Sequence, residues 1–317
     1  LGAWWGGQEG SLLFWNWLLL AFVCLVATSR PPVGLGRLWP VAMAVLMAVA
    51  AFYGWMSAAL ESPFAILQPP PADGAGLNPL LQSPSMLAHP VGLYLGYVGV
   101  SVPFAYMVAG LLLGQPVSRW AELVRPWVLA SWWFLGIGIV LGGEWAYNEL
   151  GWGGFWAWDP VENASLVPWL MGTALLHAMA AWERRGVFRL SALALAIGTF
   201  VLCIVATAMA RGDLVGGSLH TFAPSKAGHL FYGYAAALVV ACSWLLLWRR
   251  RRLRSEVLQQ ALSREGVILV GNLLLVGLAL AILVGTLFPV LTQALWRVRI
   301  ALGGAFFERV TWPLALA

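Results

Sequence analysis

Long apolar runs separated by short polar segments dominate the chain. Each run is close to the roughly 20 residues that a helix needs to cross a bilayer. A further apolar segment begins near Thr311 and continues to Ala317. The pattern therefore predicts an all-α, polytopic transmembrane helical bundle of about nine helices, forming a single membrane domain over residues 1–317. The eight complete runs lie near residues 12–29, 38–60, 90–114, 126–143, 160–183, 190–210, 230–248 and 267–290.

The composition supports a membrane protein. Hydrophobic residues make up 61% of the chain and charged residues only 10%, whereas soluble domains are roughly 25% charged. The chain starts at Leu1 and no signal-peptide pattern opens it. We therefore expect it to be a fragment of a longer chain, with material missing at both ends.

Basic residues alternate between the two sides of the predicted bundle. Of the 18 Lys and Arg, 13 lie in segments 30–37, 115–125, 184–189 and 249–264, and 5 lie in the alternate segments 61–88, 144–159, 211–229 and 291–310. The positive-inside rule places the first set in the cytoplasm. This predicts that a Trp-rich segment (144–170), which leads into the fifth helix, and a His-bearing loop (211–229) face outward. The arginine run Arg249–Arg254 then favours contact with anionic membrane lipid, and no nucleic acid is needed to explain it.

The cysteines exclude two classes of redox protein. Cys24, Cys203 and Cys242 all fall inside predicted helices, and the chain has no CxxC or CxxCH motif. It is therefore predicted to be neither a dithiol oxidoreductase nor a c-type cytochrome.

The most unusual stretch is GWGGFWAWDPVEN (Gly151–Asn163). Asp159 suits the N-cap of a helix, Pro160 the first position, and Glu162 a reciprocal capping bond. The indoles of this stretch fit either an aromatic belt at the headgroup level or a shelf for a large, flat, apolar ligand. Composition alone leaves both interpretations open. These indoles belong to Trp152, Trp156 and Trp158.

The four histidines add a metal-binding possibility. His89 precedes Pro90 and is predicted to be the N-cap of a membrane helix at the outer surface, while His220 lies in the outward loop. Either could be an ordinary polar loop residue. Together, two outward imidazoles beside an aromatic shelf fit haem iron, which takes axial imidazoles. Zinc fits less well because no cysteine and few carboxylates accompany them.

The other two histidines lie on or beside membrane helices. His177 falls inside the fifth predicted helix, where an ionisable residue is a functional candidate, although it could also hydrogen-bond a neighbouring helix. His229 stands at the outer start of the seventh helix, and we interpret it as structural.

Trp152–Leu170, WGGFWAWDPVENASLVPWL, resembles the WWD motif of the cytochrome c biogenesis membrane proteins. The continuation DPVENAS and PWL is similar to the CcmF/NrfE branch, the haem lyase subunit of system I maturation. The resemblance covers nearly the whole chain. It extends to Trp4–Trp15, Leu77–Gly99, Arg125–Gly154, Gly172–Gly186 and Gly271–Pro289.

The resemblance implies roles for individual residues. His89 and His220 would hold haem delivered by the chaperone CcmE, with the WWD tryptophans supporting the ring. Asp159 would order that support by capping the helix, with direct contact to haem as the second option. His177 would be one axial ligand of a second, permanently bound b-type haem, which would keep the incoming iron reduced with electrons that can come from quinol.

Three departures from the family pattern affect these roles. The second proline of the family's HPP segment is Val91 here. The loop around His220 reads RGDLVGGSLHTFAPSK, which differs from the usual family sequence. The second ligand of the b-type haem lies, in the family, on a helix beyond Ala317, so this chain would supply only the ligand at His177.

The implied function is cytochrome c maturation, in which haem is bound on the periplasmic face of the bacterial inner membrane and ligated to the CxxCH segment of an apocytochrome c. A thiol-handling CcmH-type subunit would be a further partner. One alternative is a haem exporter that transfers haem without ligating it. A membrane transporter of another kind would need intramembrane charges, and the chain has few.

Overall fold

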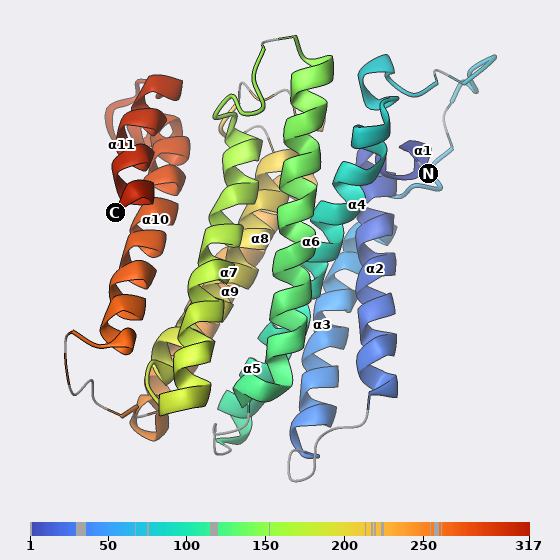
Figure 1. The fold of residues 1–317 in the computed structure, drawn as a ribbon. Coiled ribbons are helices and arrows are strands. Elements are labelled where there is room, and N and C mark those ends of the chain that lie inside the picture. The colour runs from blue at the N-terminus through green and yellow to red at the C-terminus, as the bar shows by residue number, and fades with distance from the viewer. Residues whose placement is uncertain are drawn as a thin grey trace.

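The structure is a computed structural model that describes residues 2–29, 36–66, 68–74, 76–114, 120–151, 153–212, 214–216, 218, 220–222, 225–253, 255–256, 260 and 262–317. Within these ranges it is an all-α bundle without strands (Figure 1). Eight segments are long and apolar enough to cross a membrane, with α4 and α5 together forming one of them. The predicted polytopic helical bundle is confirmed.

The helices follow one another up and down the bundle (Figure 1). Their bounds are α1 Gly2–Trp5, α2 Gln8–Thr28, α3 Leu38–Ala59, η1 Pro79–Leu81, α4 Pro84–Gly99, α5 Ser101–Leu113, α6 Trp120–Glu149, α7 Pro160–Arg185, α8 Arg189–Arg211, α9 Lys226–Arg249, η3 Arg250–Leu253, α10 Arg264–Trp296 and α11 Gly304–Leu316.

The helix predicted to begin at His89 starts earlier. α4 begins at Pro84, and the Ser83 hydroxyl accepts the backbone N–H of Met86 at 3.3 Å. A Ser-Pro pair is a strong start signal, because serine caps the free N–H groups and proline suits the first turn. The prediction that His89 is an N-cap is therefore wrong: His89 lies inside α4, and Pro90 follows it within the helix.

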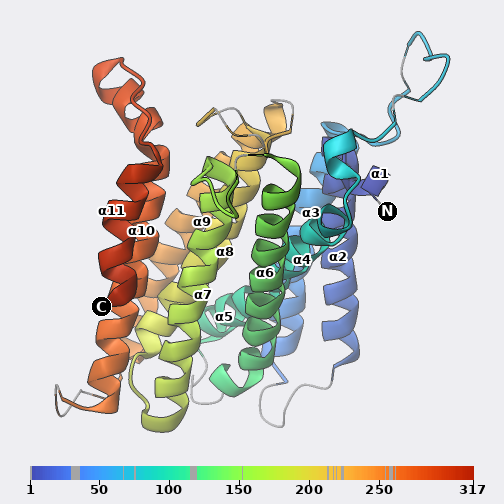
Figure 2. The ribbon, with the colours of Figure 1, turned by 45° about the horizontal axis from the view of Figure 1, so that its top comes forward.

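The last helix also starts earlier than predicted. α11 begins at Gly304 rather than near Thr311, and it lies alongside α10 (Figures 1 and 2). Phe307 of α11 is 3% exposed, and its ring stacks on Trp158 with 5.2 Å between centroids. The C-terminal helix therefore packs against the Trp-rich segment.

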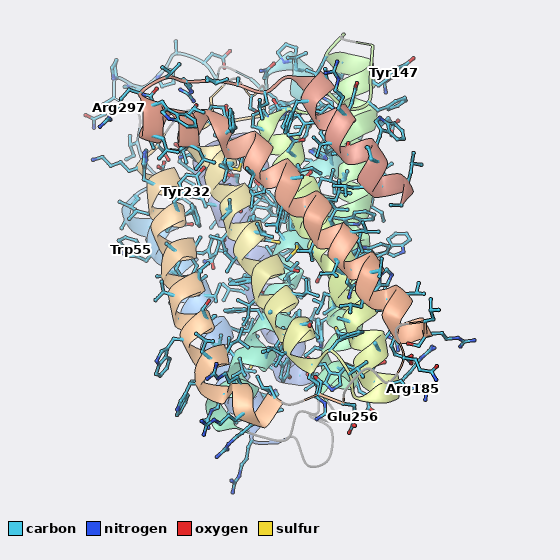
Figure 3. The ribbon with its side chains drawn as sticks, turned by 90° about the vertical axis from the view of Figure 1, so that its left-hand side faces the viewer. Trp55, Tyr147, Arg185, Tyr232, Glu256 and Arg297 are labelled. Atoms are coloured by element: carbon cyan, nitrogen blue, oxygen red, sulfur yellow. The ribbon has the colours of Figure 1, made fainter. Side chains whose placement is uncertain are left out.

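The loops gather at two ends of the bundle, as the alternation of basic residues predicts. Figure 3 shows Tyr147 and Arg297 at one end, and Arg185 and Glu256 at the other. At the second end, the backbone N–H of Glu256 donates to the carbonyl of Gly186 at 3.3 Å. Which end faces the periplasm stays a prediction.

α4 and α6 pack unusually closely because glycines meet at their interface. A Cβ on Gly96 would lie 2.6 Å from the Cβ of Leu135, and one on Gly138 would lie 2.6 Å from the backbone nitrogen of Leu93. Small residues let membrane helices approach backbone to backbone. This contact brings His89 of α4 directly against α6.

Candidate haem site

A cavity of about 530 Å³ opens at the end of the bundle that carries the Trp-rich segment and the His-bearing loop. Its walls come from α1 and α2, α4, the end of α6, the start of α7, the end of α8, and residues 220–222. Binding pockets for small molecules and cofactors typically have volumes of roughly 300–1,000 Å³. His89, His220 and Trp156 all line this cavity.

The His89 ring is held from α6. Its Nδ1 lies 2.6 Å from the carbonyl oxygen of Gly138. A carbonyl only accepts, so Nδ1 carries the proton and Nε2 is left as the nitrogen that can bind a metal. Gly142 lies against the same ring, and a Cβ there would approach Cε1 of His89 to 2.5 Å. The hydrogen bond and the glycine together fix the position of this imidazole.

His220 is oriented in a similar way by a carboxylate. Its Nδ1 lies 3.2 Å from Oδ1 of Asp159, and its side chain is only 13% exposed. The ring stands edge-on to Trp145, with 5.4 Å between centroids. The Trp145 indole is held in turn because its Nε1 donates to the carbonyl of Leu80 at 2.7 Å. As with His89, Nε2 is the nitrogen left for a metal.

Asp159 caps α7, as predicted. Its Oδ1 accepts the backbone N–H of Val161 at 2.8 Å, and Glu162 completes a capping box by accepting the backbone N–H of Asp159 at 3.1 Å. The same carboxylate accepts the hydroxyl of Ser218 at 2.7 Å. Asp159 therefore joins the helix start to the His-bearing loop.

The charge of Asp159 is stabilised by its neighbours. Burial, the largest single effect, favours the neutral carboxyl, but the hydrogen bond and charge of His220, with the Ser218 hydroxyl and the Val161 N–H, outweigh it. The pKa of Asp159 is therefore held below its usual value. An ionised carboxylate suits the role of fixing the proton on Nδ1 of His220.

The tryptophans of the motif occupy different places. Trp156 lines the cavity. Trp158 lies outside the lining and meets Trp156 edge to face, with 6.1 Å between centroids. Trp158 adopts a left-handed backbone conformation, φ 58°, and its indole stacks on the ring of Phe307. Trp152 lies outside the described residues.

Asn163 anchors the motif to α10. Its side-chain amide, 1% exposed, donates to the carbonyl of Trp158 at 3.1 Å and to the hydroxyl of Thr286 at 3.0 Å. The backbone carrying Trp156 and Trp158 is therefore tied to a helix far away in the sequence.

Comparison with known proteins identifies the family. The family model described as cytochrome C assembly protein matches residues 5–212. The chain belongs to the cytochrome c assembly protein family. It is 43% identical over 323 residues to the cytochrome c-type biogenesis protein CcmF of Escherichia coli K12, covering 100% of this chain and 50% of that protein. It is 40% identical over 317 residues to the probable biogenesis protein NrfE of the same organism, covering 100% of this chain and 57% of NrfE.

A solved structure with a similar fold supports this family assignment. The structure titled Cytochrome c Heme Lyase CcmF matches with a TM-score of 0.76 and 33% identity, covering 98% of this chain and 45% of that one. The chain spans about half the length of the relatives it matches. The predicted resemblance to the CcmF/NrfE branch is confirmed.

The remaining histidines of this assembly protein lie outside the cavity lining. His177 is on α7, as predicted, and is exposed on the surface of the bundle. Among the described residues, none donates or accepts a hydrogen bond at its ring. His229 is exposed in the first turn of α9. No group of three or more His, Cys, Asp or Glu side chains in the described ranges gathers into a multidentate metal site.

Several cavity residues of the assembly protein were not predicted. Arg211 is the most important, because it is a buried cation on the cavity wall. Trp145 and Asp159 position His220, a role that depends on contacts between distant segments. One signal was present in the sequence: Arg211 is a charged residue at the outward end of an apolar run. The unpredicted aromatic side chains on the wall are Trp5, Trp15, Tyr94, Tyr97, Trp145 and Phe222.

Proposed function

We propose that this protein binds haem as a substrate in the cavity and takes part in attaching it covalently to apocytochrome c. The observation that carries the proposal is that His89 and His220 line the same cavity, each with Nδ1 within 3.2 Å of an oxygen that can accept its proton. A metal-binding histidine typically donates its second ring N–H in this way, which fixes the tautomer and the ring orientation. Haem iron takes two such ligands on opposite faces.

The cavity walls also suit a porphyrin. Tyr94, Tyr97, Trp145 and Trp156 offer aromatic surface, which binds a flat apolar ring with little loss of side-chain entropy. Trp158 contacts Trp156 edge to face and lies outside the cavity lining. Trp152 is assigned to the support of the porphyrin by the motif alone.

Ligation adds each thiol of a CxxCH segment across one haem vinyl group. The sulfur bonds to one vinyl carbon, the thiol hydrogen goes to the other, and the addition itself gains or loses no electrons. The protein's main contribution is positional, because holding porphyrin and peptide together makes the reaction effectively intramolecular. The described residues offer no side chain that we assign as a general acid.

A second haem, the resident b-type cofactor of the family, is compatible with His177. An imidazole exposed on a membrane-spanning helix, with no hydrogen-bond partner among the described residues, is costly in lipid and suits an axial ligand. No second histidine of the described ranges accompanies it, so this chain would contribute one ligand. When bound, such a haem supplies electrons that keep the substrate iron reduced, drawn in turn from a donor such as quinol.

The proposed partners come from the resemblance to the CcmF/NrfE branch. Haem would arrive from a chaperone such as CcmE, and the peptide would arrive as reduced apocytochrome c, with a CcmH-type subunit handling its thiols. The proposed location is the bacterial inner membrane, with the cavity facing the periplasm.

The test is a reconstitution with haem-loaded chaperone and reduced apocytochrome c. The proposal predicts covalent cytochrome, seen as haem that stays with the polypeptide on a denaturing gel. His89→Ala and His220→Ala should each abolish it, while His229→Ala should leave it unchanged. Transfer of haem without covalent attachment would instead indicate a haem exporter, and full activity in both ligand variants would contradict the ligand assignment.

A further inference from the structure

Arg211 is a buried cation whose role the haem ligands do not explain. It ends α8 and is 2% exposed, and its side chain lines the cavity. One guanidinium nitrogen, Nη2, donates to the hydroxyl of Ser11 at 2.8 Å, and the group lies 5.3 Å from the ring centre of Phe222. Its Nε has no hydrogen-bond partner. Among the described residues, the Ser11 hydroxyl is the one hydrogen-bond acceptor for the five N–H donors of this guanidinium.

No carboxylate of the described residues forms an ion pair with Arg211. The ion pairs among the described residues join Arg125 to Glu183, Arg185 to Glu265, and His220 to Asp159. A buried charge is strongly unfavourable unless it is paired and hydrogen-bonded. The wall around Arg211 therefore favours an anionic ligand.

Other hydrogen-bonding groups near Arg211 also lack partners. Trp5 and Gln8 line the same cavity, and the Nε1 of Trp5 and the Oε1 of Gln8 are buried without a hydrogen bond. Gln8 lies one turn before Ser11, the partner of Arg211, on α2, and Trp5 is the last residue of α1. Trp5, Gln8 and Arg211 thus place three unsatisfied polar atoms on the wall formed by α1, α2 and the end of α8, and Nε1 of Trp156 is another on the Trp-rich segment.

Neither carboxylate on the cavity wall, Glu9 or Glu162, forms an ion pair with Arg211. Glu162 accepts the backbone N–H groups of Ala157 and Asp159, and it belongs to the start of α7. Glu9 also lines the cavity and is exposed. Among the described lining residues, Arg211 is the permanent cation.

We propose that Arg211 binds a propionate carboxylate of the haem substrate. The proposal rests on the proposed function and deepens it. Haem carries its two propionates at one edge of the ring and its vinyl groups away from that edge, and an arginine binds a carboxylate through two parallel hydrogen bonds. Anchoring a propionate at Arg211 sets the rotation of the ring about the His89–iron–His220 axis and so directs the vinyl groups away from α8. Arg211 is thus a positioning residue for ligation.

The test compares iron protoporphyrin IX with its dimethyl ester, in which both propionates are neutral. The wild-type protein, purified in lipid nanodiscs, should bind the free acid at least about tenfold more tightly than the ester, as expected for a hydrogen bond to a charged group. Arg211→Gln should lose this preference, binding both porphyrins with the ester's affinity. Arg211→Lys should keep part of it, because lysine retains the charge but not the planar fork.

Two controls separate this role from helix packing. Ser11→Ala removes the α2–α8 hydrogen bond but leaves the cation, so it should keep the preference for the free acid. Arg125→Gln removes an arginine from an exposed ion pair outside the cavity lining and should also keep it. The comparison of the two porphyrins in wild-type protein needs no variant, so it holds even if Arg211→Gln fails to fold.

The outcomes distinguish this inference from the proposed function. Equal binding of the two porphyrins by wild type, with bis-imidazole coordination intact, would overturn the role of Arg211 and leave the haem site standing. If Arg211→Gln and Ser11→Ala each weakened binding of both porphyrins to the same extent, Arg211 would only hold helices together. A wild type that binds no haem through two imidazoles would overturn the inference together with the proposed function.

Discussion

Asp159 both caps α7 and positions the proposed iron ligand His220. As an N-cap it satisfies backbone N–H groups of α7, and as a carboxylate it lies 3.2 Å from Nδ1 of His220. Both contacts converge on the same oxygen, Oδ1. The start of α7 and the proposed iron ligand are therefore held by one side chain.

Asp159→Asn should separate these two functions. Asparagine caps helices about as well as aspartate, so the melting temperature should change little. The neutral amide should weaken the orientation and basicity of His220 and lower haem affinity by about 10- to 100-fold. Haem titration and thermal unfolding measure the two effects. Asp73→Asn, at an exposed loop position, is the matched control, and unchanged haem affinity in Asp159→Asn would contradict the assigned role.

The depressed pKa of Asp159 predicts a pH dependence. Because the folded-state pKa lies below the unfolded value, roughly 3.9 for an aspartate, ionised Asp159 adds stability above the unfolded pKa, and this is lost as pH falls through the folded pKa. The difference in unfolding free energy between wild type and Asp159→Asn should be constant from pH 8 to about pH 5 and change only in more acidic solution. A difference that changes between pH 8 and about pH 5 would contradict this assignment to Asp159.

Among the elements, the contact between α4 and α6 controls the position of His89. Gly142 leaves room for the imidazole, and the carbonyl of Gly138 binds it. The backbone of α6 therefore fixes the orientation of the His89 ring, as Asp159 does for the His220 ring.

Gly142→Ala should displace His89. The new methyl group would lie 2.5 Å from Cε1 and 2.7 Å from Nδ1 of the ring, so the ring must move and its bond to Gly138 should break. Loss of the low-spin haem spectrum measures this effect. Gly277→Ala on α10 is the matched control, since no atom lies within 4 Å of its added methyl. Equal haem spectra in the two variants would show that the glycine does not position His89.

The elements also show how far sequence reasoning reaches. The helices and the cap at Asp159 could be predicted because hydrophobic run length and capping residues are local properties. The start of α4 was placed too late, because Ser83-Pro84 lies in a polar segment that the hydrophobic pattern does not include. The contacts of Arg211 with Ser11 and of Asp159 with His220 join residues 200 and 61 positions apart, and no local pattern encodes them.

At the scale of the whole molecule, the site depends on which end of the bundle faces outward. The cavity, the Trp-rich segment and the His-bearing loop share one end, and the segments richest in arginine lie at the other (Figures 1 and 3). The positive-inside rule predicts that the cavity faces the periplasm.

Cysteine labelling in intact cells tests this orientation. Asp73→Cys lies in an exposed loop at the cavity end, and Gln260→Cys is exposed at the opposite end. A membrane-impermeant maleimide should label the first variant in intact cells and the second only after lysis. The unsubstituted protein reports any labelling of its three native cysteines. The reverse pattern would place the cavity in the cytoplasm and contradict the proposed delivery route.

The most direct test of the account is the coordination of iron by His89 and His220 in one site. In a His177→Ala background, which removes the proposed resident haem ligand, purified protein loaded with haem should give the electron paramagnetic resonance signal of low-spin iron with two imidazoles. His89→Ala or His220→Ala should each convert it to a high-spin signal that added imidazole reverses, and His229→Ala should not. Retention of the two-imidazole signal in both single variants would contradict the central claim.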